Sequence, residues 1–297
     1  MNSVAEAVAS VVALQRPINA ARTPNLWPPY LELTDRLIWW TGLMIIVVAA
    51  GAWLIRGRSN PLGNAPPRPN RLMPEHLLIL MGGFFCLVWL FRWLLGRLPG
   101  DIGLTVIAGN AAQLLGAVAC LALAASLFEG GARRFSFGRG RILRRLAEGL
   151  VLFFVAITAC DVIYQATEAL IKLAGTDPAG LPKHTVIEAL ANRAVPAWAL
   201  WLGAVVIAPI AEECFFRGVF QTLVRNLTAR PWLAVLATAL AFGVAHAQQP
   251  QVIPTIAALG VLLGVSYERS GSLVTPVLLH ALFNLKTMVW QALGAGG

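Results

Sequence analysis

The chain has 297 residues, of which 58% are hydrophobic and only 12% are charged, and its mean hydropathy is +0.70. A soluble globular domain carries about 25% charged residues, so this composition excludes an ordinary soluble protein and indicates an integral membrane protein. The formal net charge of +9 does not indicate nucleic-acid binding, because the arginines gather in loops between apolar segments.

Eight apolar segments are long enough to be candidate transmembrane helices. The expected fold class is therefore all-α, a polytopic membrane helix bundle with about eight transmembrane helices. The segments cover residues 37–55, 76–95, 102–128, 150–173, 197–224, 232–247, 252–267 and 273–293.

The segments divide the chain into three expected parts. Residues 1–36 form an N-terminal segment that is either a surface helix or disordered, and residues 37–196 hold the N-terminal transmembrane helices. Residues 197–293 hold the core helices, in which the intramembrane charges lie. A proline-rich loop at 57–74 separates the first helix from the rest. Residues 175–195 contain an amphipathic piece, TVIEALAN, which is predicted to be an interfacial helix or a lid.

The distribution of arginine predicts the orientation in the membrane. Cytoplasmic loops carry an excess of Lys and Arg, so the arginine-rich loops after the first and third helices are expected to be cytoplasmic. With eight spans, both termini then lie outside. The expected location is the bacterial cytoplasmic membrane, which the chain crosses several times. The arginines on the cytoplasmic side are Arg56, Arg58, Arg68, Arg71, Arg133, Arg134, Arg139, Arg141, Arg144, Arg145, Arg225, Arg230 and Arg269.

The four cysteines lie in four different apolar segments, and none has CxxC spacing. This pattern predicts small buried apolar side chains rather than a metal site or a disulfide set. They are Cys86, Cys120, Cys160 and Cys214.

Three charged residues interrupt an apolar run, and ionisable groups at membrane depth usually mark function. Glu212, Glu213 and Arg217 are the only formal charges between Trp198 and Val224. The i,i+4 spacing predicts an ion pair between Glu213 and Arg217. Glu212 faces another direction without a helical partner, and a carboxylate in such a setting is suited to act as a general base.

Two further polar clusters follow, Phe242 with His246 and His280 with Asn284, each four residues apart. Glu212 and His246 each lie roughly 25 Å along their helices from the charged turn between them. His280 and Asn284 lie roughly 15 and 21 Å along their own helix, measured from the next hairpin turn. Polar groups from three helices are therefore expected to meet at one depth and to line one site.

The chemistry that fits this site is hydrolysis of an acyl bond. A carboxylate and a histidine can polarise a water molecule, and a second histidine with an asparagine can stabilise a developing oxyanion. The alternative is a divalent metal such as zinc, held by Glu212, His246 and His280, which is the ligand type of catalytic zinc. The sequence contains no GxSxG or HExxH motif in these helices.

With these motifs the chain resembles the CPBP family, the CAAX proteases and bacteriocin-processing enzymes also called the Abi family. The family motifs are EExxxR, FxxxH and HxxxN/D, and this chain has Glu212-Glu213-x-x-x-Arg217, Phe242-x-x-x-His246 and His280-x-x-x-Asn284 in that order. The resemblance covers about residues 197 to 285.

The resemblance implies an intramembrane endopeptidase that acts on a membrane-associated protein or peptide, including prenylated CAAX-type proteins. It implies that Glu212 and His246 activate the water, that Glu213 and Arg217 support the first motif, and that His280 and Asn284 stabilise the oxyanion. Members of the family have been described both as metalloproteases and as metal-independent glutamate proteases, so the metal state stays open.

Two other functions remain as alternatives. One is a non-catalytic membrane scaffold or immunity protein that carries the motifs without cutting. The other is a proton-coupled transporter, because Asp161, Glu168 and Lys172 place further charges in the fourth apolar segment. A transporter is expected to have repeated halves with broken helices, which the sequence does not show.

Overall fold

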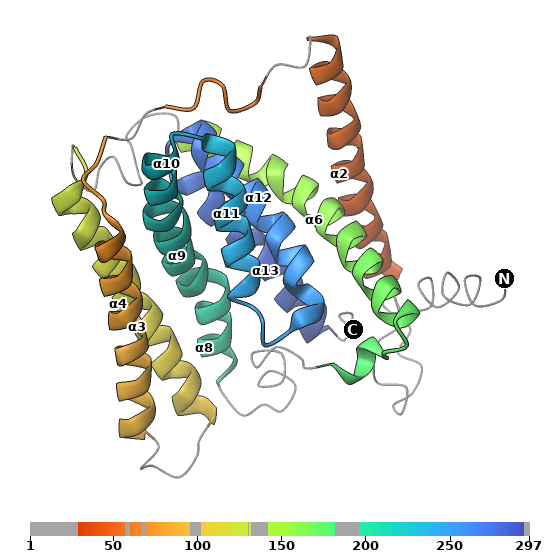
Figure 1. The fold of residues 1–297 in the computed structure, drawn as a ribbon. Coiled ribbons are helices and arrows are strands. Elements are labelled where there is room, and N and C mark those ends of the chain that lie inside the picture. Colours follow the sequence, from red (N-terminus) through yellow and green to blue (C-terminus); the bar gives the residue numbers. More distant parts are fainter. Residues whose placement is uncertain are drawn as a thin grey trace.

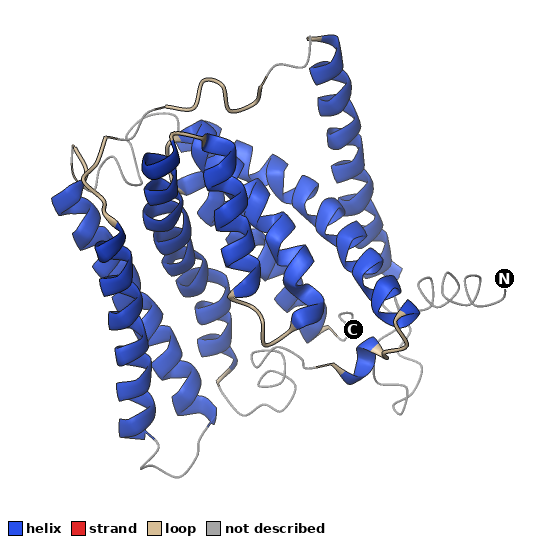
Figure 2. Ribbon diagram, in the orientation of Figure 1, coloured by secondary structure: helices blue, strands red, loops and turns tan. Residues whose placement is uncertain are grey.

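The computed structural model describes residues 29–56, 60–66, 69–95, 102–129, 131, 142–181 and 196–293. Within these residues every regular element is a helix, so the protein is an all-α polytopic bundle, as the sequence predicts (Figure 2). The helices are α2 (Pro29–Ile55), α3 (Pro74–Leu95), α4 (Ile102–Leu127), α6 (Ile142–Leu173), α8 (Ala197–Leu202), α9 (Ala208–Glu213), α10 (Thr222–Thr228), α11 (Pro231–Val244), α12 (Ile253–Ser270) and α13 (Val274–Ala292).

Each of the eight predicted segments contains a helix, and five helical stretches among the described residues are long and apolar enough to cross a membrane. Pro74–Cys86 of α3 and the whole of α11 are shorter apolar helices, and α13 is not among the five. The five are Leu31–Ile55, Val106–Leu127, Ile142–Leu173, Ala197–Thr228 and Pro250–Ser270.

Several predicted boundaries are wrong at their ends. α2 begins at Pro29, so the last residues of the expected N-terminal segment are helical. α6 begins at Ile142, and Arg144, expected in a loop, lies in its first turn, where Nε donates to Oε1 of Glu148 at 2.9 Å. This i,i+4 pair supports the helix start. Residues 1–28 of the expected N-terminal segment and the amphipathic piece at 185–192 lie outside the described residues.

A single helix, Ala197–Thr228, carries the first motif, and we refer to it as the motif helix. It contains two widened turns. The chain is helical from Ala197 to Thr228, with π-helical turns at Gly203–Ile207 (η2) and Cys214–Gln221 (η3) on either side of α9. Pro209 has no N–H and cannot bond to the carbonyl four residues earlier, which explains why the ladder widens just before it. Such turns are frequent at functional sites.

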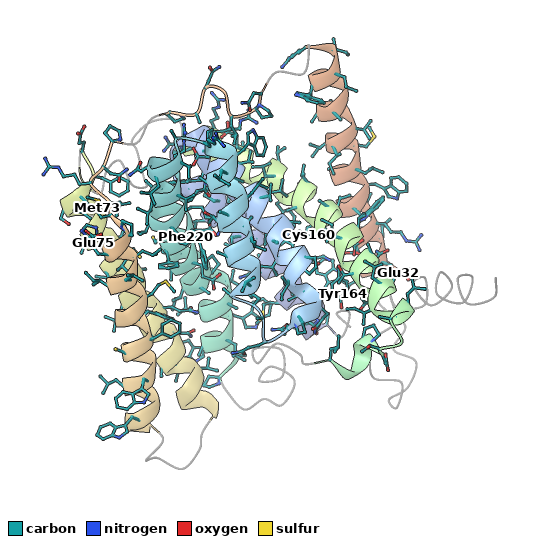
Figure 3. The ribbon with its side chains drawn as sticks, viewed as in Figure 1. Glu32, Met73, Glu75, Cys160, Tyr164 and Phe220 are labelled. Carbon is teal, nitrogen blue, oxygen red and sulfur yellow. The ribbon has the colours of Figure 1, made fainter. Side chains whose placement is uncertain are left out.

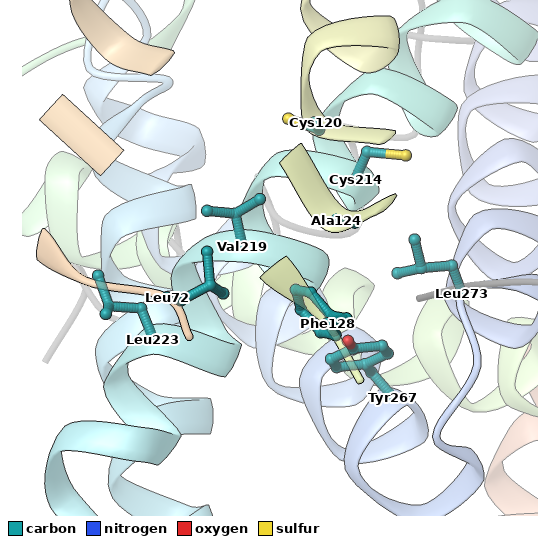
Figure 4. Packing of buried hydrophobic residues seen from close by; sticks show 9 residues of the cluster. All are labelled: Leu72, Cys120, Ala124, Phe128, Cys214, Val219, Leu223, Tyr267 and Leu273. Carbon is teal, nitrogen blue, oxygen red and sulfur yellow. The ribbon is translucent and has the colours of Figure 1, made fainter. Parts of the chain in front are cut away.

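One buried apolar cluster joins α4 to the motif helix and α12 (Figure 4). Most of the remaining large apolar side chains on α2 and α3 are exposed and project away from the bundle, as expected for helices that face lipid (Figure 3). The cluster consists of Leu72, Cys120, Ala124, Phe128, Cys214, Val219, Leu223, Tyr267 and Leu273. Cys120, Cys160 and Cys214 are buried as predicted, whereas Cys86 is exposed.

The described part of the segment between α2 and α3 lies across the ends of several helices. Nε1 of Trp232 donates to Oδ1 of Asn60 at 3.0 Å, and Nδ2 of Asn226 donates to Oδ1 of Asn70 at 2.6 Å. The carboxyl end of α10 and the amino end of α11 therefore lie at the end of the bundle where α2 finishes (Figure 1). The arginine-rich ends of these helices share one side, which agrees with the expected orientation.

Candidate active site

The centre of the site is an ion pair buried on both sides. Nη1 of Arg217 donates to Oε1 of Glu213 at 2.9 Å, and both side chains are fully buried. The other guanidinium nitrogen, Nη2, donates to the carbonyl of Gly260 on α12 at 3.3 Å. The guanidinium carbon also lies 4.5 Å from the centre of the Phe242 ring, in cation–π range. The predicted i,i+4 pair is confirmed, and it is held by two further helices.

Two glycines on α12 allow this helix to lie close to α11 and to the motif helix. A Cβ atom on Gly260 would lie 2.9 Å from Cα of Ala239 on α11, and one on Gly264 would lie 2.9 Å from Oε1 of Gln221. Only glycine permits so close an approach, as GxxxG spacing predicts. The carbonyl of Gly264 accepts a hydrogen bond from Nε2 of Gln221 at 3.1 Å, as that of Gly260 does from Arg217.

The same contact continues towards the arginine-rich end of the bundle. Nε2 of Gln221 also donates to Oε1 of the fully buried Glu268 at 2.9 Å, and Oε2 of Glu268 lies 3.8 Å from Nε of Arg225. We refer to Glu213, Arg217, Gln221, Gly260, Gly264 and Glu268 as the buried polar seam. Gln221 and Glu268 were not predicted from the sequence, although the four-residue spacing on both helices is a signal that could have found them.

His280 lies between the two adjacent glutamates. Its Nδ1 lies 2.9 Å from Oε1 of Glu213, and its Nε2 lies 3.9 Å from Oε2 of Glu212. A carboxylate accepts hydrogen bonds, so Nδ1 is the donor and Nε2 faces Glu212. Glu213 therefore orients His280 as well as pairing with Arg217, a contact between helices that spacing along one helix did not predict.

The two glutamates differ in exposure. The side chain of Glu212 is 25% exposed and that of Glu213 is fully buried. The distance from Glu212 to His280 is too long for a direct hydrogen bond, and a contact of that length leaves room for a bridging water. Of the two, Glu212 is the carboxylate that solvent can reach.

His246 does not lie on a helix, contrary to the prediction. α11 ends at Val244, and His246 follows in a turn, where its Nδ1 donates to the carbonyl of Phe242 at 2.9 Å. That carbonyl belongs to the last turn of the helix, which lacks helical partners, so the histidine satisfies it and keeps Nε2 free. The Phe242 ring contacts both histidines, with centroid distances of 5.2 Å to His246 and 5.6 Å to His280.

Asn284 is held by the first widened turn. Its Nδ2 donates to the carbonyl of Ala204 in η2 at 2.8 Å. An amide nitrogen carries two hydrogens, so one remains for a substrate oxygen. Asn284 lies one helical turn beyond His280 on α13. Thus Glu212, Glu213, Phe242 and the two histidines are linked by direct contacts, and Asn284 joins them through the backbone of the motif helix.

The alternative zinc site does not fit this arrangement. Among the described residues, no three His, Cys, Asp or Glu side chains are grouped so that they could hold a metal ion. Glu212 and His280 face each other, but Nδ1 of His280 is hydrogen-bonded to Glu213. His246 lies in the turn after α11, where its Nδ1 is bound to the carbonyl of Phe242. The mechanism proposed for this site therefore contains no metal-bound step.

The charges considered for transport lie elsewhere. Oδ2 of Asp161 on α6 accepts a hydrogen bond from Nε2 of Gln165, one turn away, at 2.8 Å, and Glu168 is buried on the same helix. A separate ion pair joins Lys286 on α13 to Asp35 on α2 at 3.0 Å. None of these hydrogen bonds or ion pairs includes a motif residue.

Comparison with known proteins agrees with the motifs. A protein from Escherichia coli named "Uncharacterized 24.3 kDa protein" is 37% identical over 95 residues, which is 30% of this chain and 43% of that protein. No solved structure matches the chain. A family model described as type II CAAX prenyl endopeptidase Rce1-like matches residues 194–286. Residues 194–286 are therefore similar to the Rce1-like family, in agreement with the CPBP resemblance of the motifs.

Proposed function

We propose that this protein is an intramembrane endopeptidase that hydrolyses a peptide bond of a membrane-associated protein by means of activated water. The observation that carries the proposal is the difference in burial and contacts between the adjacent glutamates. Glu213 is buried and paired with Arg217 and His280, whereas Glu212 is partly exposed and faces Nε2 of His280 at 3.9 Å. The first is suited to hold the site and the second to take a proton.

In this proposal the water lies between Glu212 and the histidines. Glu212 removes a proton from the water, whose oxygen attacks the carbonyl carbon of the scissile bond. His246, whose Nε2 is free because Nδ1 is bound to Phe242, shares in polarising the water. A proton then passes to the leaving amine nitrogen, so that the C–N bond breaks and a carboxylic acid and an amine result.

The negative charge on the carbonyl oxygen needs donors fixed in advance. His280 can donate through Nε2 when its ring carries both protons, and the Glu213 carboxylate accepts the hydrogen bond from Nδ1. Asn284 can donate through its second amide hydrogen, since the first is bound to Ala204. Both donors sit on α13, one turn apart, so a single carbonyl oxygen can reach both.

The proposed peptidase acts within a membrane. The catalytic core is residues 197–293, and the helices of residues 37–196 pack around it in the bacterial cytoplasmic membrane. The partners are the lipid bilayer and a protein or peptide held in it. The comparison with the prenyl endopeptidases supports peptide-bond hydrolysis as the class of reaction. The matched E. coli protein aligns over less than half of its length, and its name states no activity.

The test uses the full chain in lipid nanodiscs with a pool of membrane-inserted peptides, and mass spectrometry to identify new termini. We expect the wild type to cut at least one peptide at a defined bond and Glu212→Gln to cut none. The matched control is Glu148→Gln on α6, a partly exposed carboxylate far from the motifs in sequence. Equal cleavage by wild type and Glu212→Gln would refute the proposed water activation.

A further inference from the structure

We propose that the candidate active site opens to the membrane face opposite the arginine-rich loops. Its substrate would then be a peptide segment presented at the non-cytoplasmic face, as in an exported or outward-facing membrane polypeptide. The substrate side rests on the proposed peptidase function, but the direction of the opening rests on the structure alone. Three features carry it: a closed end, a short hairpin and the order of exposure of the motif residues.

The side of the site towards the arginine-rich end is closed by the buried polar seam. Beyond Glu213 in that direction lie Arg217, Gln221 and Glu268, whose side chains have no exposed surface. Their groups bridge the motif helix and α12 from Gly260 to the last turn before Gly271. These tightly paired groups leave no path for a peptide between the motif helix and α12 from that end.

The opposite side of the site is formed by the hairpin of α11 and α12, in which α11 is a short helix. α11 has 14 residues from Pro231 to Val244. Such a helix is about 21 Å long, whereas the hydrocarbon core of a bilayer is about 30 Å thick. Since α11 begins beside Arg230 at the arginine-rich end, its other end falls short of the opposite surface. Figure 1 shows the connection between α11 and α12 at the end of the bundle where α8 begins.

The connection has irregular backbone with polar residues. It runs through His246, Gln248 and Gln249 before η4 (Pro250–Val252), and Gln248 is exposed. Irregular backbone within membrane depth is tolerated where it is buried in protein or lines a water-filled cavity, and not where it faces lipid. An exposed amide beside a partly exposed histidine therefore indicates water that reaches down to His246 from this face.

The exposure of the motif residues follows the same direction. Glu213 and His280, next to the seam, are 0% and 4% exposed. Glu212 has a quarter of its side chain exposed, and His246 and Asn284 are also partly exposed. The reactive groups are thus closed off on one side and accessible on the other.

The arginines assign this face to a side of the membrane. Arg56, Arg144, Arg225, Arg230 and Arg269 all lie at or near the helix ends of the closed side. Under the positive-inside rule that side is cytoplasmic. A prenylated protein is anchored to the cytoplasmic leaflet, so it would meet the closed end. The opening suits instead an extended peptide on the outer side.

The opening can be tested by thiol labelling in right-side-out and inside-out membrane vesicles with a membrane-impermeant maleimide. The probe is Gln248→Cys, and the matched control is Asn64→Cys, an exposed residue of the arginine-rich end. Both variants are made in a Cys86→Ser background, because Cys86 is exposed, whereas Cys120, Cys160 and Cys214 are buried. The Cys86→Ser protein without a new cysteine gives the background label. We expect Gln248→Cys to react in right-side-out vesicles and Asn64→Cys to react in inside-out vesicles. Labelling after denaturation verifies that each thiol is present.

Reaction of Gln248→Cys only in inside-out vesicles, on the same side as Asn64→Cys, or in neither preparation would overturn the proposal. The substrate side is read by adding the cleaved peptide to each kind of vesicle, with cleavage expected in right-side-out vesicles. If purified protein cuts no peptide at all, the proposed peptidase function fails, while the labelling still decides the direction of the opening. If cleavage occurs only in inside-out vesicles, the function stands and the outward substrate is wrong.

Discussion

Nδ1 of His280 lies 2.9 Å from Oε1 of Glu213, the same oxygen that accepts a hydrogen bond from Arg217. One buried carboxylate therefore fixes both a cation of its own helix and a histidine of α13. With Nδ1 engaged as the donor, the ring presents Nε2 to Glu212. This geometry fits the proposed roles, in which Glu213 positions His280 and Glu212 faces the substrate. The predictions below separate these roles.

Replacing Arg217 by alanine should strongly destabilise the protein. Breaking a buried ion pair by removing one partner costs about 3–5 kcal/mol, because it leaves a buried charge unpaired. We expect a lower midpoint of thermal unfolding in detergent and less folded protein in membranes. Arg144→Ala is the control, since that side chain is 65% exposed and an exposed pair is worth about 0–1 kcal/mol. Equal midpoints for the two variants would contradict the buried pairing.

The neighbouring glutamates should respond differently to the same change. Glu213→Gln removes the carboxylate that is hydrogen-bonded to the buried Arg217 and should also cost about 3–5 kcal/mol. Glu212→Gln changes a partly exposed side chain and should alter the free energy of unfolding by about 0.5 kcal/mol or less. Denaturant titration of both variants measures the difference. A larger loss for Glu212→Gln would reverse the two assignments.

The close approach of α11 and α12 should be intolerant of a methyl group. Gly260→Ala would place a Cβ 2.9 Å from Cα of Ala239, and such overpacking typically costs about 1–3 kcal/mol. It should also weaken the bond from Arg217 to the carbonyl of Gly260. Gly51→Ala on α2 is the matched control, because its Cβ would meet no atom within 4 Å. Thermal unfolding should separate the variants, and unchanged stability in Gly260→Ala would show that the helices are further apart.

Removing the amide of Asn284 should reduce cleavage more than stability. Loss of one oxyanion donor lowers kcat by about 100- to 1000-fold. Loss of the hydrogen bond to Ala204 costs only about 1 kcal/mol. The assay is the rate of peptide cleavage by Asn284→Ala at saturating substrate, beside its unfolding midpoint. Thr287→Ala, an exposed residue of the same helix, is the control. Full activity in Asn284→Ala would remove it from the oxyanion site.

Cleavage should persist when a strong chelator is present. The described residues offer no group of three ligands placed to hold a metal ion, and the proposed water is activated by Glu212 and His246. The measurement is wild-type cleavage before and after dialysis against chelator, with metal content determined by mass spectrometry. Activity that disappears with chelator and returns with zinc would replace the proposed mechanism with a metal-dependent one.

The sequence by itself determined the helices and the motif residues that meet at the candidate site. Long apolar runs must form helices in lipid, because every backbone polar group needs an internal partner there. The pairing of Glu213 with Arg217 followed from spacing along one helix, since residues four apart are neighbours on its surface. The ends of α2, α6 and α11 were less well defined, because arginines and prolines at a boundary fit a helix turn as readily as a loop.

Only the tertiary structure decided how the motifs meet. The bonds of His280 to Glu213 and of Asn284 to Ala204 join residues 67 and 80 positions apart, and no local spacing specifies them. They depend on the widened turns beside α9 and on the glycines that set the distance between α11 and α12. The position of His246 beyond the end of α11 likewise depends on where the helix stops. Side chains on one helix are placed by its own geometry, whereas contacts between helices are placed by packing.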